Sequence, residues 1–269
     1  MNTNYQLSVD TGRLTIENGT ANPKWFRPDV DPHNIRNLMQ KSDAIAIRDT
    51  AIWLGMMIVS AGCAVALWPS VWSVPFWLAY GVLYGSAADS RWHECGHKTA
   101  FKTTWMNNAV YQLASFMIMR NPAIWQASHV RHHTDTIIVG RDPEIVAMRP
   151  PDLARIALAF VGVADVYIAF KRMILHASGR IDPEEATYVA AKDHAKVFRV
   201  ARIWLFIYGC TIAAAVLMTS LLPLMLIGFP RLYGAWHHVL TGLLQHVGLA
   251  ENVSDHRLNT RTVLMNPVS

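Results

Sequence analysis

Two long stretches without charge most constrain what this chain can fold into. The 39 residues 50–88 contain no Asp, Glu, Lys or Arg, and the 48 residues 203–250 contain only Arg231. A helix needs about 20 mainly apolar residues to cross the hydrocarbon core of a bilayer, so each stretch is long enough for two crossings. The composition agrees, because 16% of the 269 residues are charged, whereas a soluble domain has roughly 25%. We therefore predict an integral membrane protein.

Proline interrupts each uncharged stretch near its middle, which predicts two helical hairpins. Pro69 and Pro75 break the first stretch, and Pro223 breaks the second. The polar residues 1–49 are expected to form an N-terminal arm, followed by one membrane domain over 50–269. The predicted fold class is all-α, a bundle of four membrane-spanning helices over residues 50–68, 74–90, 202–221 and 224–246.

The cations lie beside the apolar stretches, so the net charge of +5 gives no reason to expect nucleic acid as a partner. Lys24, Arg27, Arg36, Lys41 and Arg48 precede the first stretch, and Lys196, Arg199 and Arg202 precede the second. This asymmetry is the positive-inside pattern, which predicts that both termini and the central region face the cytoplasm.

Five of the twelve histidines lie in two short clusters. HECGH holds His93 and His97, and HVRHH holds His129, His132 and His133. Residues three or four apart share a helix face, so each cluster can aim its rings at one site. Neutral imidazole nitrogen suits iron, zinc and copper. Five such donors exceed what one metal with an open reactive position accommodates, which indicates two metals.

Both clusters must lie on the same side of the membrane to share a site. Residues 103–119, which separate them, are therefore expected to form an in-plane or re-entrant helix, and residues 153–170 another. These helices would form a cytoplasmic cap that carries the metals. Acidic groups that could orient the ligand rings are Asp89, four residues before His93, and Asp135 and Asp142, while His256 is a candidate supporting group.

The two clusters resemble the first two histidine boxes of the membrane fatty acid desaturase and hydroxylase superfamily. There the first box is a His-x-x-x-His variant that often begins His-Glu and has Gly before the second His, and the second box is His-x-x-His-His. The placement is similar too, because the first box follows a transmembrane hairpin. The closing sequence GLLQHVGLAENVSDHRLNTRT resembles the region after the fourth span of bacterial members, where an isolated histidine joins the metal set. His246 occupies that position.

The resemblance implies an O₂-dependent oxidoreductase with two non-haem irons, acting on an unactivated C–H bond of a fatty acyl or similar lipid chain. The product would be a double bond or an alcohol. Electrons would come from a ferredoxin, a rubredoxin or a cytochrome b5-type donor. The implied metal ligands are His93, His97, His129, His132, His133 and His246.

The sequence departs from the family pattern in one respect, since no third His-x-x-His-His box follows His133. The later pair His237–His238 has Gly234 three residues earlier, and we expect it to lie inside the bilayer. Six histidines are too few for two irons, so the sequence is interpreted as the N-terminal part of a longer protein with the third box beyond Ser269. This polypeptide alone is then expected to be an inactive fragment.

Two other functions fit part of the pattern. HECGH also matches the His-Glu-x-x-His motif of zinc metalloproteases, in which Glu94 would be the general base. A haem protein would use one or two axial histidines, fewer than the clusters supply. Neither alternative explains three histidines in HVRHH.

Overall fold

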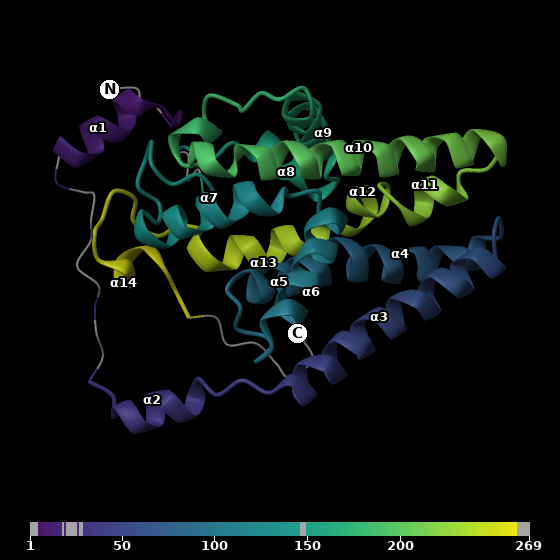
Figure 1. Ribbon diagram of the computed structural model, residues 1–269, viewed down its shortest axis with the longest axis horizontal. Helices are drawn as coiled ribbons and strands as arrows, with labels where there is room; N and C mark the ends of the chain where they lie inside the picture. The colour runs from purple at the N-terminus through teal and green to yellow at the C-terminus, as the bar shows by residue number, and fades with distance from the viewer. Residues whose placement is uncertain (1–4, 18, 20–25, 27–28, 146–148, 263–269) are drawn as a thin grey trace.

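The computed structural model describes residues 5–17, 19, 26, 29–145 and 149–262, and its regular elements are helices (Figure 1). Within these residues there is no strand, as the all-α prediction requires. The α-helices are α1 (Val9–Glu17), α2 (Pro32–Leu38), α3 (Asp43–Ala66), α4 (Val74–Val82), α5 (Ala88–Gly96), α6 (Thr104–Met117), α7 (Pro122–Thr134), α8 (Leu153–Phe160), α9 (Val163–Ala177), α10 (His194–Leu217), α11 (Leu222–Leu226), α12 (Pro230–Gly234), α13 (Trp236–His246) and α14 (His256–Asn259). A π-helical turn, η2 (Leu83–Ala87), joins α4 to α5, and three short 3₁₀ turns are η1 (Val71–Ser73), η3 (Glu185–Thr187) and η4 (Ala191–Asp193).

Two helical segments in the described part of the chain are long and apolar enough to cross a membrane. They are Pro32–Ala66, which contains α2 and α3, and Ala191–Leu217, which contains α10. Helices α8 and α9 pass the same test as a pair bent by 81°, as in a broken span or a re-entrant loop. By length and composition the described residues thus offer two or three candidate spans, against the four of the prediction. Figure 1 shows α10 and α3 on opposite sides of a layer that contains α4, α5, α6, α7 and α13.

The first hairpin breaks where the prolines predict, but its first helix begins earlier than expected. Helix α3 starts at Asp43 rather than near residue 50, because the Ser42 side chain caps it by accepting a hydrogen bond from the Ile45 amide. The last residues of the predicted polar arm, 43–49, therefore form about the first two turns of α3, which is a candidate membrane span. The turn between α3 and α4 contains Pro69, and α4 has Pro75 in its first turn.

The fourth predicted span is not one helix, which corrects the expectation for residues 224–246. It is divided into α11, α12 and α13. Gly228 adopts a left-handed backbone (φ 98°) between α11 and α12, and Pro230 begins α12. The Arg231 side chain, 3% exposed, donates from a guanidinium nitrogen to the Gly85 carbonyl at 2.8 Å. Arg231 therefore faces the protein interior.

The π-helical turn η2 anchors the second helix of the hairpin just before the first histidine box. A π turn leaves the regular α-helical hydrogen-bond pattern, so its carbonyls are available to other partners. The Leu83 carbonyl accepts from the Trp53 indole of α3 at 2.9 Å, and the Gly85 carbonyl accepts from Arg231 of α12. Helix α5, which carries HECGH, thus leaves a turn that is tied to two other helices.

Close backbone packing also joins α4 to α12. A Cβ atom added at Gly234 would lie 1.8 Å from the Gly81 carbonyl oxygen, and one added at Gly85 would lie 3.2 Å from the Gly234 carbonyl carbon. Glycine at these positions allows the two helix backbones to touch, as in other small-residue helix contacts.

Helix α6 separates the two histidine boxes in sequence without separating them in space. Its 14 residues reach about 21 Å at 1.5 Å per residue, which is shorter than the hydrocarbon core of a bilayer. The chain turns after α6 and enters α7, which carries HVRHH beside α5. Residues 103–119 therefore place the boxes at one site, as the in-plane interpretation requires.

Candidate metal centre

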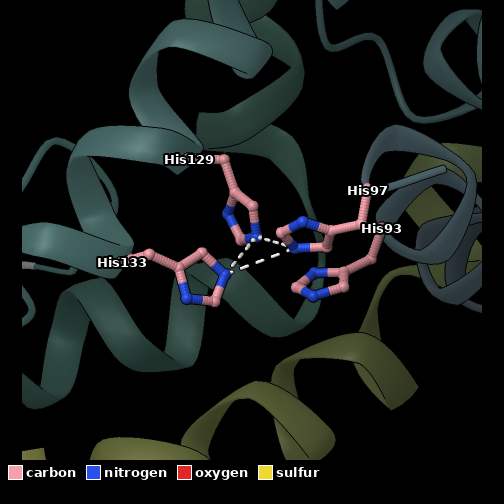
Figure 2. A group of neighbouring side chains, drawn as sticks. All are labelled: His93, His97, His129 and His133. Carbon is pink, nitrogen blue, oxygen red and sulfur yellow. Dashed lines mark hydrogen bonds between the residues drawn. The ribbon is translucent and has the colours of Figure 1, made fainter. Parts of the chain in front are cut away.

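Four histidines from α5 and α7 converge on one point (Figure 2). His93 and His97 come from the end of α5, and His129 and His133 come from consecutive turns of α7. One ligand nitrogen from each ring lies within 4.8 Å of the others. The Nε2 atoms of His97 and His129 are 2.9 Å apart, those of His129 and His133 are 3.0 Å apart, and those of His133 and His97 are 3.3 Å apart. We call this group the four-histidine cluster.

The spacing and chemistry of the cluster fit a transition-metal ion. Imidazole nitrogen binds such ions at about 2.1 Å, so neighbouring donors around one ion stand roughly 3 Å apart. The Glu144 carboxylate lies 2.9 Å from Nδ1 of His129. The proton of a neutral His129 ring is therefore held on Nδ1, and its Nε2 lone pair faces the other rings. Lone pairs that converge at this distance repel one another unless a cation or shared protons lie between them.

Burial favours the neutral form of three rings of the cluster, His93, His97 and His133. Loss of water lowers the pKa of His93 to about 4, and the neighbouring rings His129 and His97 lower it further. The pKa of His133 falls to about 4 for the same reasons, and burial also lowers the pKa of His97. Neutral imidazole is the form that binds metal, so these rings need lose no proton to become ligands.

His132 does not join the cluster, although it lies in the same box. Its ring contacts that of His246 from α13, with ring centroids 5.4 Å apart and planes nearly perpendicular. HVRHH therefore directs two rings to the four-histidine cluster and the third toward His246. Successive residues turn by about 100° on an α-helix, so His129 and His133 share a direction to within about 40°, whereas His132 points elsewhere. We call His132 and His246 the histidine pair.

Both rings of the histidine pair are held at Nδ1. Nδ1 of His132 lies 2.9 and 3.1 Å from the two Asp142 carboxylate oxygens, and Nδ1 of His246 donates to the Asn259 carbonyl at 2.9 Å. Both histidines are 8% exposed. Burial opposes a charge on His132, but the hydrogen bond and charge of Asp142 outweigh burial and raise its pKa. Both Nε2 atoms remain for a metal.

The acceptors of HVRHH come from the loop after α7. Asp142 also accepts hydrogen bonds from the backbone amides of Ile137, Glu144 and Ile145, so one buried carboxylate fixes both the loop and His132. Glu144 accepts from the Ser128 hydroxyl at 2.7 Å as well as from His129. Burial raises the pKa of Glu144, but the hydrogen bond and charge of His129 outweigh it and lower that pKa.

The other predicted supporting groups have different partners. Asp89 bonds to Arg120 at 3.2 Å and to Nδ1 of His238 at 3.0 Å. Asp135 pairs with Arg141 at 2.8 Å and with Arg131 at 3.7 Å. His256 begins α14 and is outside the histidine groups of the described residues.

Glu144 is the supporting group that the sequence analysis missed. The signal available was an acidic residue two positions after Asp142, in the sequence RDPE. Its role depends on a turn that brings residue 144 back to residue 129, and no periodic pattern in the sequence encodes that turn.

Aromatic side chains pack against the His129 ring of the cluster. The Trp125 ring stacks on His129 with centroids 4.2 Å apart and planes at 21°, and Trp92 packs on Trp125 at 3.7 Å. Gly96 makes room for Trp125, because a Cβ atom at residue 96 would lie 2.1 Å from the indole ring. Cys95, between the box histidines, is buried, and burial raises the pKa of its thiol to about 12. No thiolate is therefore expected beside the cluster.

The position of Glu94 argues against a zinc protease. Its side chain is 53% exposed, lies 3.7 Å from Arg91 and is outside the group of residues that could share a metal ion among those the structure describes. The cluster also has four donors, whereas a protease zinc site keeps an open position beside three. A porphyrin would not fit between Nε2 atoms that stand about 3 Å apart, so the haem alternative fails as well.

Comparison with known proteins gives a consistent family. A sequence model of the family "Fatty acid desaturase" matches residues 66–269. A bifunctional fatty acid conjugase/Delta(12)-oleate desaturase of Punica granatum is 30% identical over 126 residues, which cover 45% of this chain and 31% of that protein. An endoplasmic reticulum omega-6 fatty acid desaturase (isozyme 1) of Glycine max is 27% identical over 124 residues, with the same coverage of each chain. The chain thus spans about a third of the length of these relatives.

Proposed function

Because the chain belongs to the fatty acid desaturase family, we propose that it is an O₂-dependent, non-haem di-iron oxidoreductase of lipid chains. Its reaction would remove hydrogen from unactivated C–H bonds of a fatty acyl or similar chain, giving a double bond or an alcohol. The convergence of His93, His97, His129 and His133 is the observation that carries this proposal, since it assembles a four-nitrogen metal site from two separate boxes.

The two histidine groups would serve two irons. The four-histidine cluster has enough donors to hold one ion, while the histidine pair offers two Nε2 atoms toward the second. The donor set is nitrogen only, which suits iron and does not suit magnesium or calcium. A pair of irons held in this way supplies the oxidising chemistry that activates O₂ toward a C–H bond.

The protein residues around the rings would keep the donor nitrogens in place and facing the metal positions. Glu144 and Asp142 hold Nδ1 of His129 and His132, so Nε2 of each ring faces its metal site. Carboxylate–histidine pairs of this kind also raise the basicity of the ligand nitrogen. Trp125 fixes the plane of His129 by stacking. Burial of the pair excludes water from the second position.

The lipid substrate would reach the site from the membrane. We propose a multi-pass protein whose four crossings are formed by α3, by α4 with η2, by α10 and by α11 to α13, with the last crossing broken at Gly228. The lysine and arginine residues that flank the apolar stretches favour termini and boxes on the cytoplasmic face. That face would also receive electrons from a ferredoxin, a rubredoxin or a cytochrome b5-type donor.

Lipid analysis of cells that express the protein tests this function. Membranes from cells with the full-length wild-type protein should contain acyl chains with a new double bond or hydroxyl group. Cells with the His129→Ala variant of that protein should lack them at equal protein level. If the full-length wild-type protein changes no lipid in cells that contain a suitable electron donor, or if His129→Ala forms the same product, the proposed reaction is wrong.

A further inference from the structure

Helix α1 covers the loop that holds the metal-ligand acceptors, although more than a hundred residues separate them in sequence. The Thr11 hydroxyl lies 3.4 Å from the Gly140 carbonyl oxygen, and the Thr15 hydroxyl lies 3.3 Å from the Val139 carbonyl oxygen and 2.9 Å from the Thr11 carbonyl oxygen of its own helix. In return the Arg141 guanidinium donates to the Gly12 carbonyl at 3.5 Å. Three successive loop residues thus contact one face of α1.

Gly140 permits this close approach. Its φ of +76° lies in the left-handed region, and a Cβ atom there would be 2.7 Å from the Thr11 Cβ and 2.9 Å from its hydroxyl oxygen. A larger residue at position 140 would push α1 away from the loop. The contact between α1 and the loop therefore depends on Thr11 in the helix and on Gly140 in the loop.

The opposite side of the loop is fixed by the segment that follows α13. Asn252 donates from its backbone amide to the Ile137 carbonyl at 3.1 Å, and its side-chain oxygen accepts from the Val139 amide at 2.9 Å. Asn259 donates to the Thr136 carbonyl at 2.8 Å while its own carbonyl holds His246. The loop therefore lies between α1 and the segment that orients His246.

We propose that α1 is a positioning element of the metal centre. By clamping residues 139–141 it fixes Asp142 and Glu144, and through these carboxylates it fixes the Nδ1 atoms of His132 and His129. The inference rests on the proposed function in one respect, which is that these histidines bind metal. It adds that the N-terminal segment sets the affinity of a site to which it contributes no ligand.

The loop transmits this effect because it has little freedom of its own. Asp142 accepts from the backbone amides of Ile137 and Glu144, at 2.8 Å each, and from His132 at 2.9 Å. A change in the backbone at residue 140 therefore moves the carboxylate that orients the ring. Removing groups that orient metal ligands typically lowers metal affinity 10- to 100-fold.

A matched pair of glycine substitutions tests the clamp. Gly140→Ala introduces both left-handed strain and the contact with Thr11, whereas Gly179→Ala introduces similar strain (φ +83°) with its nearest neighbour, a terminal nitrogen of Arg202, at 3.9 Å. The full chain in detergent is titrated with Co²⁺, whose visible spectrum reports the geometry of its ligands. We expect Gly140→Ala to bind Co²⁺ about 10- to 100-fold more weakly with an altered spectrum, and Gly179→Ala to stay within about twofold of wild type.

A second measurement uses the metal-free protein, where ligand loss plays no part. The backbone amides of Ile137, Glu144 and Ile145 donate hydrogen bonds to the Asp142 carboxylate. Hydrogen exchange at these amides should be faster in Gly140→Ala and unchanged in Gly179→Ala. Thr15→Val keeps the side-chain shape but removes the hydroxyl beside the Val139 carbonyl, and should weaken Co²⁺ binding by about threefold. This milder variant keeps the test valid if Gly140→Ala does not fold.

The outcomes separate the clamp from the proposed function. If wild type binds Co²⁺ and both Gly140→Ala and Thr15→Val bind it equally well with the same spectrum, α1 does not position the ligands. Lower thermal stability of Gly140→Ala with an unchanged Co²⁺ spectrum would reduce α1 to a structural role and overturn the inference. If wild type binds no Co²⁺, the metal site itself is wrong, and unchanged exchange in Gly140→Ala would then also reject the clamp.

Discussion

The four-histidine cluster and the histidine pair both contain histidines from adjacent positions of α7, but the two groups are built differently. In the cluster, donors from two helices meet with Nε2 atoms 2.9 to 3.3 Å apart, and His97 and His133 keep exposed surface. In the pair, two buried rings stand 5.4 Å apart, each held at Nδ1 by an oxygen from a different segment. The comparison indicates that the acceptor on Nδ1, together with helix spacing, sets which of the two proposed metal positions each ring faces.

The largest effect should come from removing a shared donor of the cluster. His129 lies within 3.0 Å of both His97 and His133, so His129→Ala should lower the metal affinity of the cluster more than about 100-fold, beyond the loss expected for a supporting group. The measurement is metal content per chain after equilibration with Fe²⁺ without oxygen.

His132→Ala is the matched control, because it removes a histidine of the same box whose ring faces His246 and lies outside the four-histidine cluster. It should spare the cluster and remove a ligand of the histidine pair, so that the cluster still binds one ion per chain. Equal losses of metal in the two variants would contradict the division into two positions.

The next effect should come from the acceptors, which sharpen the comparison because each serves one group. Glu144→Gln removes the charge that faces Nδ1 of His129 but keeps an acceptor oxygen, and should weaken metal binding at the cluster about 10- to 100-fold. Asp142→Asn should act mainly on His132 and the histidine pair. Titration of each variant with Co²⁺ measures this difference.

The effects of Glu144→Gln and Asp142→Asn on the cluster can be compared in a common background by adding His132→Ala to each variant. Since this background lacks one ring of the pair, Asp142→Asn should then change the affinity of the cluster less than Glu144→Gln does. If the two variants weaken the cluster equally, the loop acts as a single unit and the acceptors are not separate.

A smaller effect should come from the support below the cluster. Gly96→Ala places a Cβ atom 2.1 Å from the Trp125 ring, and overpacking of this kind costs about 1–3 kcal/mol. We expect roughly tenfold weaker metal binding, since Trp125 must move away from His129. Gly62→Ala in α3, where a Cβ meets nothing within 4 Å, is the control for the substitution itself.

A smaller ring at position 125 should restore binding if the contact is the cause. The double variant Gly96→Ala with Trp125→Phe is therefore expected to bind metal more tightly than Gly96→Ala alone. A double variant no better than Gly96→Ala would show that the glycine serves the helix backbone instead.

The sequence predicted the all-α fold, the break at Pro69 and the boxes at one site, because charge-free length, proline and the i, i+4 spacing are local signals. It did not predict the division of residues 224–246 into three helices. That break depends on Arg231, whose guanidinium binds the carbonyl of Gly85 in the π turn, and a contact between residues 146 positions apart leaves no local pattern.

The candidate site shows the same limit. The spacing of HVRHH was consistent with one shared point, because helix geometry gives the direction of a ring only to within its rotamers. Hydrogen bonds from Nδ1 to Asp142 and to the Asn259 carbonyl orient the rings of His132 and His246, respectively. Asp89 was expected to support His93 from its spacing, but Arg120 and His238 bind it more directly. Groups that are held by partners from distant segments are those whose contacts the sequence did not predict.

The smallest effect is expected for substitution of Glu94, and a variant that behaves like wild type would be informative. Glu94→Gln should leave the metal affinity of the cluster within about twofold, because the side chain is 53% exposed and lies beside Arg91. The lipid product should also be unchanged. In a zinc protease this glutamate would be the general base, so its loss would abolish peptide hydrolysis. A Glu94→Gln chain that keeps its metal and its lipid product therefore separates a cluster in which both boxes supply ligands from a zinc site in which the first box supplies the catalytic base. Loss of the lipid product in this variant would mean that the exposed face of α5 contributes to the reaction.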